Sequence, residues 1–365
     1  MKVIQIVSNK FWGGGERYVF DLSRSLRDEG CDVEIVARDY NDVAGRFIDD
    51  AFMVSVAPLG GIIDFISSRR IAKIINSCKD NRVIIHCHNF KDAISALRAR
   101  HLTHRAKVGV VITRHLVKAA KTDRLHRWVY RGANHIIFVS QLAMDTFLSS
   151  NPPIDRCKLS VVHNSVKVDT AVKRVEPEPT SDGLSLKLLF VGRVCRDKGI
   201  EVLLDALKLL KDERLTLDVV GTGDDSYVER LKQKAGDNGI SERVNWLGFH
   251  EDVHPFIESA DVVVCPSIVR EACPLSVLEC MAHGKAVIAS DNGGQAEFVA
   301  SGRNGVLVPS GDPEGLAEAI RGLIASLELR QRLGRNALSD FRETLSYPVF
   351  IAKMQKIYED VLIER

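Results

Sequence analysis

Residues 186–192 (LKLLFVG), followed by residues 193–199 (RVCRDKG) and residues 200–210 (IEVLLDALKLL), decide the fold of this chain. A short apolar run, a turn that contains glycine and an apolar pattern of helical period indicate a strand, a loop and a helix. The same alternation occurs along the whole chain, which is typical of βαβ units on a parallel sheet. We therefore predict an α/β fold.

Two groups of strands are expected, with amphipathic segments between them. The first group is predicted at 2–7, 32–37, 82–87, 107–112 and 135–139, and the second at 186–192, 215–221, 243–248, 261–266 and 285–290. A chain of 365 residues is too long for one ordinary core and suits two domains. Each group of strands therefore predicts one doubly wound, Rossmann-like domain.

The domain boundaries follow from a change in composition. Residues 171–185 (AVKRVEPEPTSDGLS) contain Pro, Gly, Ser and charges without a period, which indicates an exposed linker. A break near Tyr347 and Pro348 precedes a last helix, which is expected to pack back on the first domain. The predicted divisions are an N-terminal domain over 1–168, a linker over 169–185, a C-terminal domain over 186–345 and the terminal helix over 346–365.

Composition excludes several classes of protein. The formal net charge is +2, so overall charge gives no reason to expect a nucleic-acid partner. Residues 1–10 (MKVIQIVSNK) lack the apolar core of a secretory signal, and no window reaches the ~18 uncharged apolar residues of a spanning helix. We expect a cytoplasmic protein that is at most peripheral at the inner face of the membrane.

Neither metal nor cofactor is expected. The eight cysteines are scattered without the close spacing of a zinc site or a disulfide framework, which predicts reduced and mostly buried thiols. An Asp-X-Asp triplet, a common metal–diphosphate ligand set in nucleotide-sugar enzymes, is absent from the sequence. We therefore predict a site without a metal ion.

Two glycine-containing turns are candidates for binding phosphate. Gly14 and Gly15 follow the first strand and precede a helix, where backbone N–H groups can approach a diphosphate. A tight turn without a ligand is the alternative, and the absence of G-x-G-x-x-G disfavours a nicotinamide cofactor. In the second turn, Arg193 and Lys198 follow Gly192 at a strand end. Each could form an ordinary surface salt bridge, but two cations together at this position favour binding of phosphate oxygens.

Two glutamates eight residues apart form a further candidate. Glu271 precedes a predicted helix and Glu279 lies within it, so both can face the same side about two turns apart. An isolated Glu is usually a solvated residue. The position of this pair between two very apolar strands favours a functional role. A second glycine pair, Gly293-Gly294, follows the next strand and is either a turn or a ligand contact.

Taken in order, these motifs resemble those of family 4 of the retaining glycosyltransferases, which have the GT-B fold. The motifs are GGGER (13–17), TRH (113–115), HNSV (163–166), FVGRVCRDKG (190–199), VVGTGD (219–224), VNWLGF (244–249), E-x7-E (271–279), NGG-x-x-E (292–297) and NGVLVPSGDP (304–313). The resemblance covers nearly the whole chain. It implies two Rossmann-like domains that face each other across a deep cleft, with the donor in the C-terminal domain and the acceptor in the N-terminal one.

The resemblance also implies roles for single residues. Those matched to catalysis are Arg193 and Lys198 on the donor diphosphate, Glu271 on the donor sugar hydroxyls, and His115 facing that sugar. Those matched to donor binding are Gly14 and Gly15 at the diphosphate, and the backbone amides around Pro274, Leu275 and Ser276 near the sugar and diphosphate. Glu279 is matched to the ribose, and Gly221, Gly223 and Gly248 lie in segments that are matched to the surroundings of the base. His86 and His88 compete with His115. Ala272-Cys273-Pro274 departs from the family's Gly-Phe-Gly, which puts the outline of the sugar pocket in doubt.

The implied activity is metal-independent transfer of a sugar from a nucleotide sugar, with retention by front-face attack. A UDP-sugar is the predicted co-substrate, although no residue specifies the base. Two alternatives stay open. One is an epimerase or phosphorylase of the same fold, but neither the added first-domain carboxylates nor the pyridoxal lysine is identified. The other is a non-catalytic nucleotide-sugar-binding protein. The presence of all four charged residues of the motifs argues against it, namely Arg193, Lys198, Glu271 and Glu279.

A basic segment over 98–131 suggests the nature of the acceptor. It contains ten Lys and Arg, four of the eleven His and one acid, Asp123. Such a surface suits anionic lipid or a phosphorylated glycan, whereas a solvated basic face is the alternative. The predicted acceptor or membrane contacts are Lys118, Lys121, Arg124 and Arg127. A lipopolysaccharide core or a lipid-linked oligosaccharide is the expected acceptor.

Overall fold

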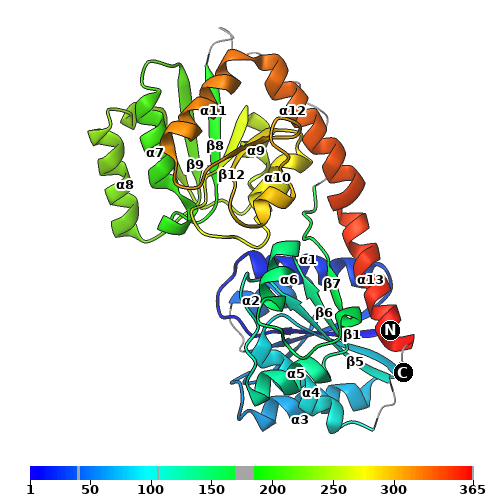
Figure 1. Cartoon of the computed structure of the whole chain (residues 1–365). Helices are drawn as coiled ribbons and strands as arrows, with labels where there is room; N and C mark the ends of the chain where they lie inside the picture. Colours follow the sequence, from blue (N-terminus) through cyan, green and yellow to red (C-terminus); the bar gives the residue numbers. More distant parts are fainter. Residues whose placement is uncertain (39–41, 105–106, 169–184, 364–365) are drawn as a thin grey trace. The chain divides into compact units, whose positions relative to one another are not determined.

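The computed structural model describes residues 1–38, 42–104, 107–168 and 185–363 (Figure 1). The linker predicted over 169–185 thus lies outside the described residues except for its last position. The chain divides into two compact units, which are described separately below. One comprises Met1–Asn164 with Pro348–Arg365, and the other Ser165–Tyr347.

The first unit is built on a parallel sheet of seven strands in the order β3-β2-β1-β4-β5-β6-β7. The strands are β1 Lys2–Val7, β2 Asp32–Ala37, β3 Met53–Val56, β4 Arg82–Cys87, β5 Lys107–Arg114, β6 His135–Phe138 and β7 Leu159–Val161. All five strands predicted for this unit are present. The sequence does not predict β3 and β7, because both are short edge strands that are only partly buried and lack a clear apolar pattern.

Helices cover both faces of this sheet (Figure 1). They are α1 Gly14–Asp28, α2 Asp42–Asp49, α3 Phe65–Ser77, α4 Phe90–His101, α5 Arg124–Gly132 and α6 Gln141–Leu148. Helices α3, α4 and α5 lie on one face and α1 lies on the other (Figure 1). On the α3–α4 face, Ile4 and Ile6 of β1 share one buried cluster with Ile71 of α3 and Ile94 of α4. The central strands are therefore covered by apolar side chains.

The last helix, α13 (Tyr347–Ile363), belongs to the first unit from Pro348 onward. Its Tyr358 is fully buried, and the hydroxyl lies 2.8 Å from His86 Nδ1 of β4. The ring of Phe350 packs edge-on against Tyr18 of α1 with centroids 5.4 Å apart. Segments from both ends of the chain therefore form one core.

The second unit contains a parallel sheet of six strands in the order β10-β9-β8-β11-β12-β13. The strands are β8 Leu186–Val191, β9 Leu215–Val220, β10 Val244–Gly248, β11 Val262–Cys265, β12 Ala286–Ser290 and β13 Val306–Val308. The five predicted strands are confirmed. The edge strand β13 has only three residues, too few for a periodic signal in the sequence.

The helices of the second unit pack against this sheet. They are α7 Ile200–Leu209, α8 Asp225–Asp237, α9 His254–Ser259, α10 Leu275–Ala282, α11 Pro313–Ala325 and α12 Leu327–Asp340. A π-helical turn, Phe341–Leu345, continues α12, and the helical run is interrupted at Ser346, whose backbone is extended. None of the described helices is long and apolar enough to cross a membrane.

All eight cysteines carry free thiols. Cys78, Cys87, Cys265 and Cys280 are buried and Cys157 is exposed.

The order of strands reverses once in each sheet, between β1 and β4 and between β8 and β11. In open parallel sheets, ligands bind beyond the carboxyl ends of the strands at this point of reversal. The loops that follow these strands are therefore the place to look for a site in each unit.

Candidate active site

In the second unit, the loops after β8, β9 and β10 are joined by backbone hydrogen bonds. Gly192 N donates to Val220 O at 3.0 Å, and Gly221 N donates to Gly248 O at 2.7 Å. A Cβ on Gly221, whose φ is +138°, would lie 1.8 Å from Gly192 O. A Cβ on Gly223 would lie equally close to Val194 O. The structure thus brings Gly221, Gly223 and Gly248 to one edge, where close backbone approach requires the first two to be glycine.

Lys198 and Glu271 meet at the reversal point between β8 and β11. Lys198 ends a 3-10 turn, Arg196–Lys198, and its Nζ lies 2.7 Å from Glu271 Oε2. The two side chains are only 20% and 18% exposed. Ser267, which follows β11, donates a hydrogen bond to the other oxygen of Glu271. Both carboxylate oxygens are therefore held in place by partners from two different strand ends.

The backbone of Glu271 is fixed by the loop after β12. Gly294 N donates to Glu271 O at 2.7 Å, and a Cβ on Gly293, whose φ is +74°, would lie 2.7 Å from Glu271 N. The predicted glycine pair is thus explained by a close approach of two loops. Whether it also touches a ligand stays a prediction.

Helix α10 begins directly after the loop that follows β11 and carries Glu271. Pro274 is its N-cap and Leu275 and Ser276 form its first turn, whose backbone N–H groups have no partner within the helix. Such a terminus favours an anion. Glu279 lies in the second turn and is partly buried. Glu271 and Glu279 therefore stand before and within the helix, as the sequence predicts.

The two predicted phosphate ligands differ in their surroundings. Lys198 is half-buried and paired, whereas Arg193 is exposed and has no ion pair within the described part of the chain. Arg193 is therefore available to an incoming anion without first leaving a protein carboxylate.

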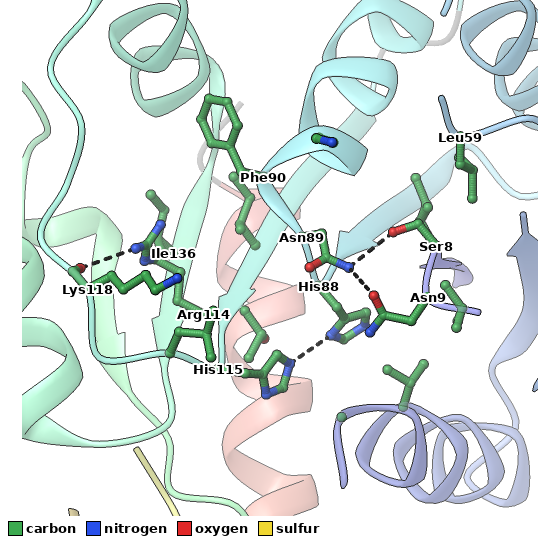
Figure 2. A pocket seen from close by; sticks show the side chains of 18 of the residues that line it. Ser8, Asn9, Leu59, His88, Asn89, Phe90, Arg114, His115, Lys118 and Ile136 are labelled. Carbon is green, nitrogen blue, oxygen red and sulfur yellow. Dashed lines mark hydrogen bonds between the residues drawn. The ribbon is translucent and has the colours of Figure 1, made fainter. Parts of the chain in front are cut away.

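In the first unit, a pocket of about 740 Å³ lies beyond the carboxyl ends of the strands (Figure 2). Its lining includes Ser8 and Asn9, which follow β1, Gly15 and Glu16 of α1, and His88, which follows β4. Gly14 begins α1 but does not line the pocket in the part of the chain that the structure describes.

Three histidines are candidates for the residue that faces the donor sugar, and the structure distinguishes His86 from His88 and His115. His86 is fully buried, with Nε2 2.7 Å from Thr113 Oγ1 and Nδ1 bonded to Tyr358. His88 and His115 both line the pocket, with His88 Nδ1 3.3 Å from His115 Nε2 (Figure 2). Burial lowers the pKa of His86 to about 3 and that of His115 to about 4, so both are neutral at pH 7.

The predicted basic segment divides into two parts. Lys118 and Lys121 line the pocket, together with Arg114 at the end of β5. Arg124 and Arg127 lie on α5, are exposed, and are not among the described lining residues. The segment is therefore not one uniform surface.

Asp92 is a buried carboxylate that sequence reasoning missed. Ser8 Oγ donates to Asp92 Oδ2 at 2.9 Å, and Asn89 Nδ2 donates to Ser8 Oγ at 3.1 Å, so Asp92 lies behind two residues of the pocket wall. Burial raises the pKa of Asp92 to about 7. An Asp in the first turn of a helix is ordinary, so the sequence carries no signal of its burial.

Asp92 leads to a prediction on pH dependence. Because the folded pKa lies near 7 and the unfolded one near 4, the folded state holds this proton more tightly, and stability is lost as pH rises from about 4 to about 7. Asp92→Asn should remove this contribution. Urea unfolding of wild type and variant at several pH values measures it, and an unchanged slope over this range would contradict the assignment.

Among the described residues, no group of three or more His, Cys, Asp or Glu side chains is placed to hold a metal ion. The predicted metal independence still requires an experiment.

Two doubly wound parallel sheets, each with charged and glycine-rich loops at the carboxyl edge, are the architecture of the GT-B glycosyltransferases, a fold that other enzymes share. Two family models match, Glycosyl transferases group 1 over residues 174–340 and Glycosyltransferase Family 4 over residues 12–170. The chain belongs to this family of glycosyltransferases. The predicted family, fold and enzyme class are confirmed.

Relatives of the chain include an uncharacterized glycosyltransferase of Methanocaldococcus jannaschii, 29% identical over 63% of this chain and 59% of the relative. The lipopolysaccharide core biosynthesis glycosyltransferase LpsE of Rhizobium meliloti is 34% identical over 40% of this chain and 42% of its own length. The chain thus matches less than two thirds of the length of each of these two relatives. A phosphatidyl-myo-inositol mannosyltransferase of Mycobacterium leprae is 28% identical over 96% of this chain and 93% of the relative.

A crystal structure of Anabaena HepE in complex with UDP has a similar fold, with a TM-score of 0.84 and 19% identity over 99% of this chain and all of the other.

Proposed function

We propose that this protein transfers a sugar from a nucleotide diphosphate donor to a glycan or lipid-linked acceptor, with retention of configuration and without a metal ion. The observation that carries the proposal is the pairing of Lys198 with Glu271 at 2.7 Å, at the reversal point of the second sheet. The pair supports a site in which a cation that binds a phosphate lies beside a carboxylate that binds sugar hydroxyls. The family membership makes sugar transfer the reaction that this arrangement serves.

On the donor side, Lys198 and Arg193 act on the diphosphate. Negative charge grows on the leaving phosphate as the glycosidic bond breaks, so both cations stabilise the transition state more than the ground state. This electrostatic role is the one that a divalent metal has in other enzymes. The first turn of α10 adds backbone N–H groups to the same anion.

The surroundings of Glu271 bear on how the proposed retention would be achieved. Retaining glycosidases use a carboxylate nucleophile that attacks the sugar. Both oxygens of Glu271 already accept hydrogen bonds, from Lys198 and Ser267, which favours a carboxylate that holds hydroxyls over one that attacks carbon. The proposed mechanism is front-face attack, in which the leaving phosphate accepts the proton of the acceptor hydroxyl.

A UDP-sugar is the proposed donor, supported by the similar HepE structure, which contains UDP. The acceptor is proposed to belong to envelope glycan synthesis. The names of two relatives support this, one for the lipopolysaccharide core and one for phosphatidyl-myo-inositol.

A thermal-shift screen against UDP-, GDP- and ADP-sugars tests the donor, and incubation of the best donor with lipid and glycan fractions tests transfer. Proton NMR of the product then reports the anomeric configuration. Binding without turnover would favour a non-catalytic binding protein, and conversion of the free nucleotide sugar to its epimer would favour an epimerase. An inverted product would overturn the retaining mechanism.

Transfer is expected to persist in excess EDTA, because Arg193 and Lys198 supply the positive charge at the diphosphate. Initial rates with and without the chelator, at saturating donor, measure this directly. Loss of activity that magnesium or manganese restores would contradict the prediction.

A further inference from the structure

The pocket of the first unit carries positive charge that its own carboxylates do not balance. Its described lining includes five cations, and Glu16 is the one carboxylate among those residues; Asn9 donates a hydrogen bond to it. The five cations are Arg38, Lys91, Arg114, Lys118 and Lys121. A pocket of this kind favours an anionic ligand.

Among these cations, Arg114 gives the strongest indication of an anionic ligand. Its Nη2 donates to the carbonyl of Lys118 at 3.3 Å, and its guanidinium lies 4.8 Å from the ring centroid of Phe147. Its Nε is buried and has no hydrogen-bond partner among the described residues, and burial lowers its pKa. A buried charge without a counter-ion is costly, so a ligand anion at this position would offset the cost.

The basic segment contains no free carboxylate for these cations. Asp123, its one acid, caps α5 by accepting hydrogen bonds from Leu125 N at 3.0 Å and His126 N at 3.1 Å. Its second oxygen lies 2.6 Å from His126 Nδ1. Figure 2 shows Arg114 and Lys118 together on one side of the pocket, away from Ser8 and Asn9 on the other.

We propose that Arg114, Lys118 and Lys121 bind an anionic group of the acceptor, a phosphate or a carboxylate. The planar guanidinium matches two oxygens of such a group, and the two lysines add mobile charge at the pocket wall. This inference rests on the proposed function, because it assigns the pocket to the acceptor. The donor diphosphate is the other source of the same chemistry, and the experiment separates the two.

The test uses inorganic phosphate as the probe, titrated into the full chain by calorimetry with and without saturating UDP. Phosphate should bind in both conditions, and Arg114→Gln and Lys121→Gln should each weaken it at least tenfold. Arg124→Gln is the matched control, since Arg124 is an exposed arginine of the same segment outside the described lining. It should bind phosphate like wild type.

Displacement of phosphate by UDP would overturn the assignment to the acceptor, as would normal phosphate binding by both pocket variants. Lys121 is exposed, so its variant remains informative even if Arg114→Gln does not fold. UDP affinity of the variants should stay unchanged. Failure of wild type to bind any nucleotide would instead count against the proposed function.

A second feature of the first unit is the loop before α3 together with the first two residues of that helix. Ile62, Ile63, Phe65 and Ile66 are all more than half exposed, and Ile63 reaches 84%. The loop is nevertheless well anchored. Asp64 accepts hydrogen bonds from Gly60 N and Ser67 N, each at 2.9 Å, so the apolar side chains are presented by an ordered turn.

One cation contacts these residues, and others lie nearby in the sequence. Arg98 donates to Ile62 O at 2.6 Å and lies 4.6 Å from the ring centroid of Phe65. Exposed basic residues nearby in the sequence are Arg69, Arg70 and Lys73 on α3. Gly60, at the start of the loop, also lines the pocket. Exposed apolar groups close to basic residues are the pattern of a surface that enters the headgroup layer of an anionic membrane.

We infer that residues 60–66, which comprise the loop before α3 and the first two residues of that helix, dock the first unit on an anionic phospholipid bilayer. Co-sedimentation with vesicles of phosphatidylglycerol and phosphatidylcholine tests it. The double variant Ile63→Asp with Phe65→Asp should reduce the bound fraction at least tenfold. Leu209→Asp, on α7 of the second unit and 47% exposed, is the matched control and should bind like wild type. Equal binding by wild type and the double variant would overturn the inference, as would equal loss in the control.

Discussion

Lys198→Ala should lower kcat by roughly 100-fold or more, the size found when one preorganised electrostatic contact is removed from an active site. Glu271 holds the ammonium at the strand end, 2.7 Å away, before any donor arrives, and we expect the ammonium to stabilise the charge that develops on the leaving phosphate. Glu271→Gln should lower kcat to a similar degree. It removes the charge that positions Lys198 and weakens the hold on the donor sugar.

Glu279→Gln should behave differently. The proposed partner of Glu279 is the ribose, which does not react, so its loss weakens ground and transition states alike and mainly raises the donor KM. Steady-state kinetics of the three variants, with UDP affinity measured separately as a check on folding, distinguish these outcomes. If Glu279→Gln abolishes turnover at saturating donor while Glu271→Gln does not, the two roles are wrongly assigned.

A matched control for Lys198 exists in the same unit. Lys232 also lies 2.7 Å from a glutamate, Glu229, but this pair is exposed on α8. Lys232→Ala should leave kcat unchanged, because an exposed pair contributes little and has no part in the site. An equal loss in both lysine variants would mean that the effect of Lys198→Ala is not catalytic.

Strand patterns and turn residues predicted most of the fold. The ten strands expected from apolar runs are present. Nine of them are interior strands of parallel sheets, which are buried on both faces and appear as continuous apolar runs, and the tenth, β10, is an edge strand. The three strands not predicted, β3, β7 and β13, are edge strands of three or four residues. Their pairing depends on neighbours that are distant in sequence, which no local pattern reveals.

The candidate site was predictable where residues follow strands directly. Lys198 and Glu271 are 73 positions apart, yet each follows a strand, and adjacency of β8 and β11 brings them together. Burial of single polar groups was not predictable. Asp92 and Arg114 look like ordinary charged residues in the sequence, and only tertiary packing removes them from water. The same holds for His86, whose partner Tyr358 comes from the last helix.

Gly221→Ala should destabilise the second unit by about 3 kcal/mol or more, because the new methyl group would overlap a backbone carbonyl that has no room to move. Its Cβ would lie 1.8 Å from Gly192 O, and relief of that overlap requires the ends of β8 and β9 to separate. The same movement would strain the 2.7 Å hydrogen bond from Gly221 N to Gly248 O, which joins β9 to β10. UDP affinity should therefore fall together with stability.

Gly239 supplies the control that isolates the overlap from backbone strain. Its φ of +69° is also in the left-handed region, but a Cβ there would meet no atom within 4 Å. Gly239→Ala should therefore cost only about 1 kcal/mol, the penalty of the backbone conformation alone. Hydrogen exchange of the backbone amides in residues 215–248 at increasing urea measures the local stability of both variants. A local measurement is needed because the two units need not unfold in a single transition. Equal losses in the two variants would show that the backbone conformation, and not the close approach of β8 and β9, makes glycine necessary at 221.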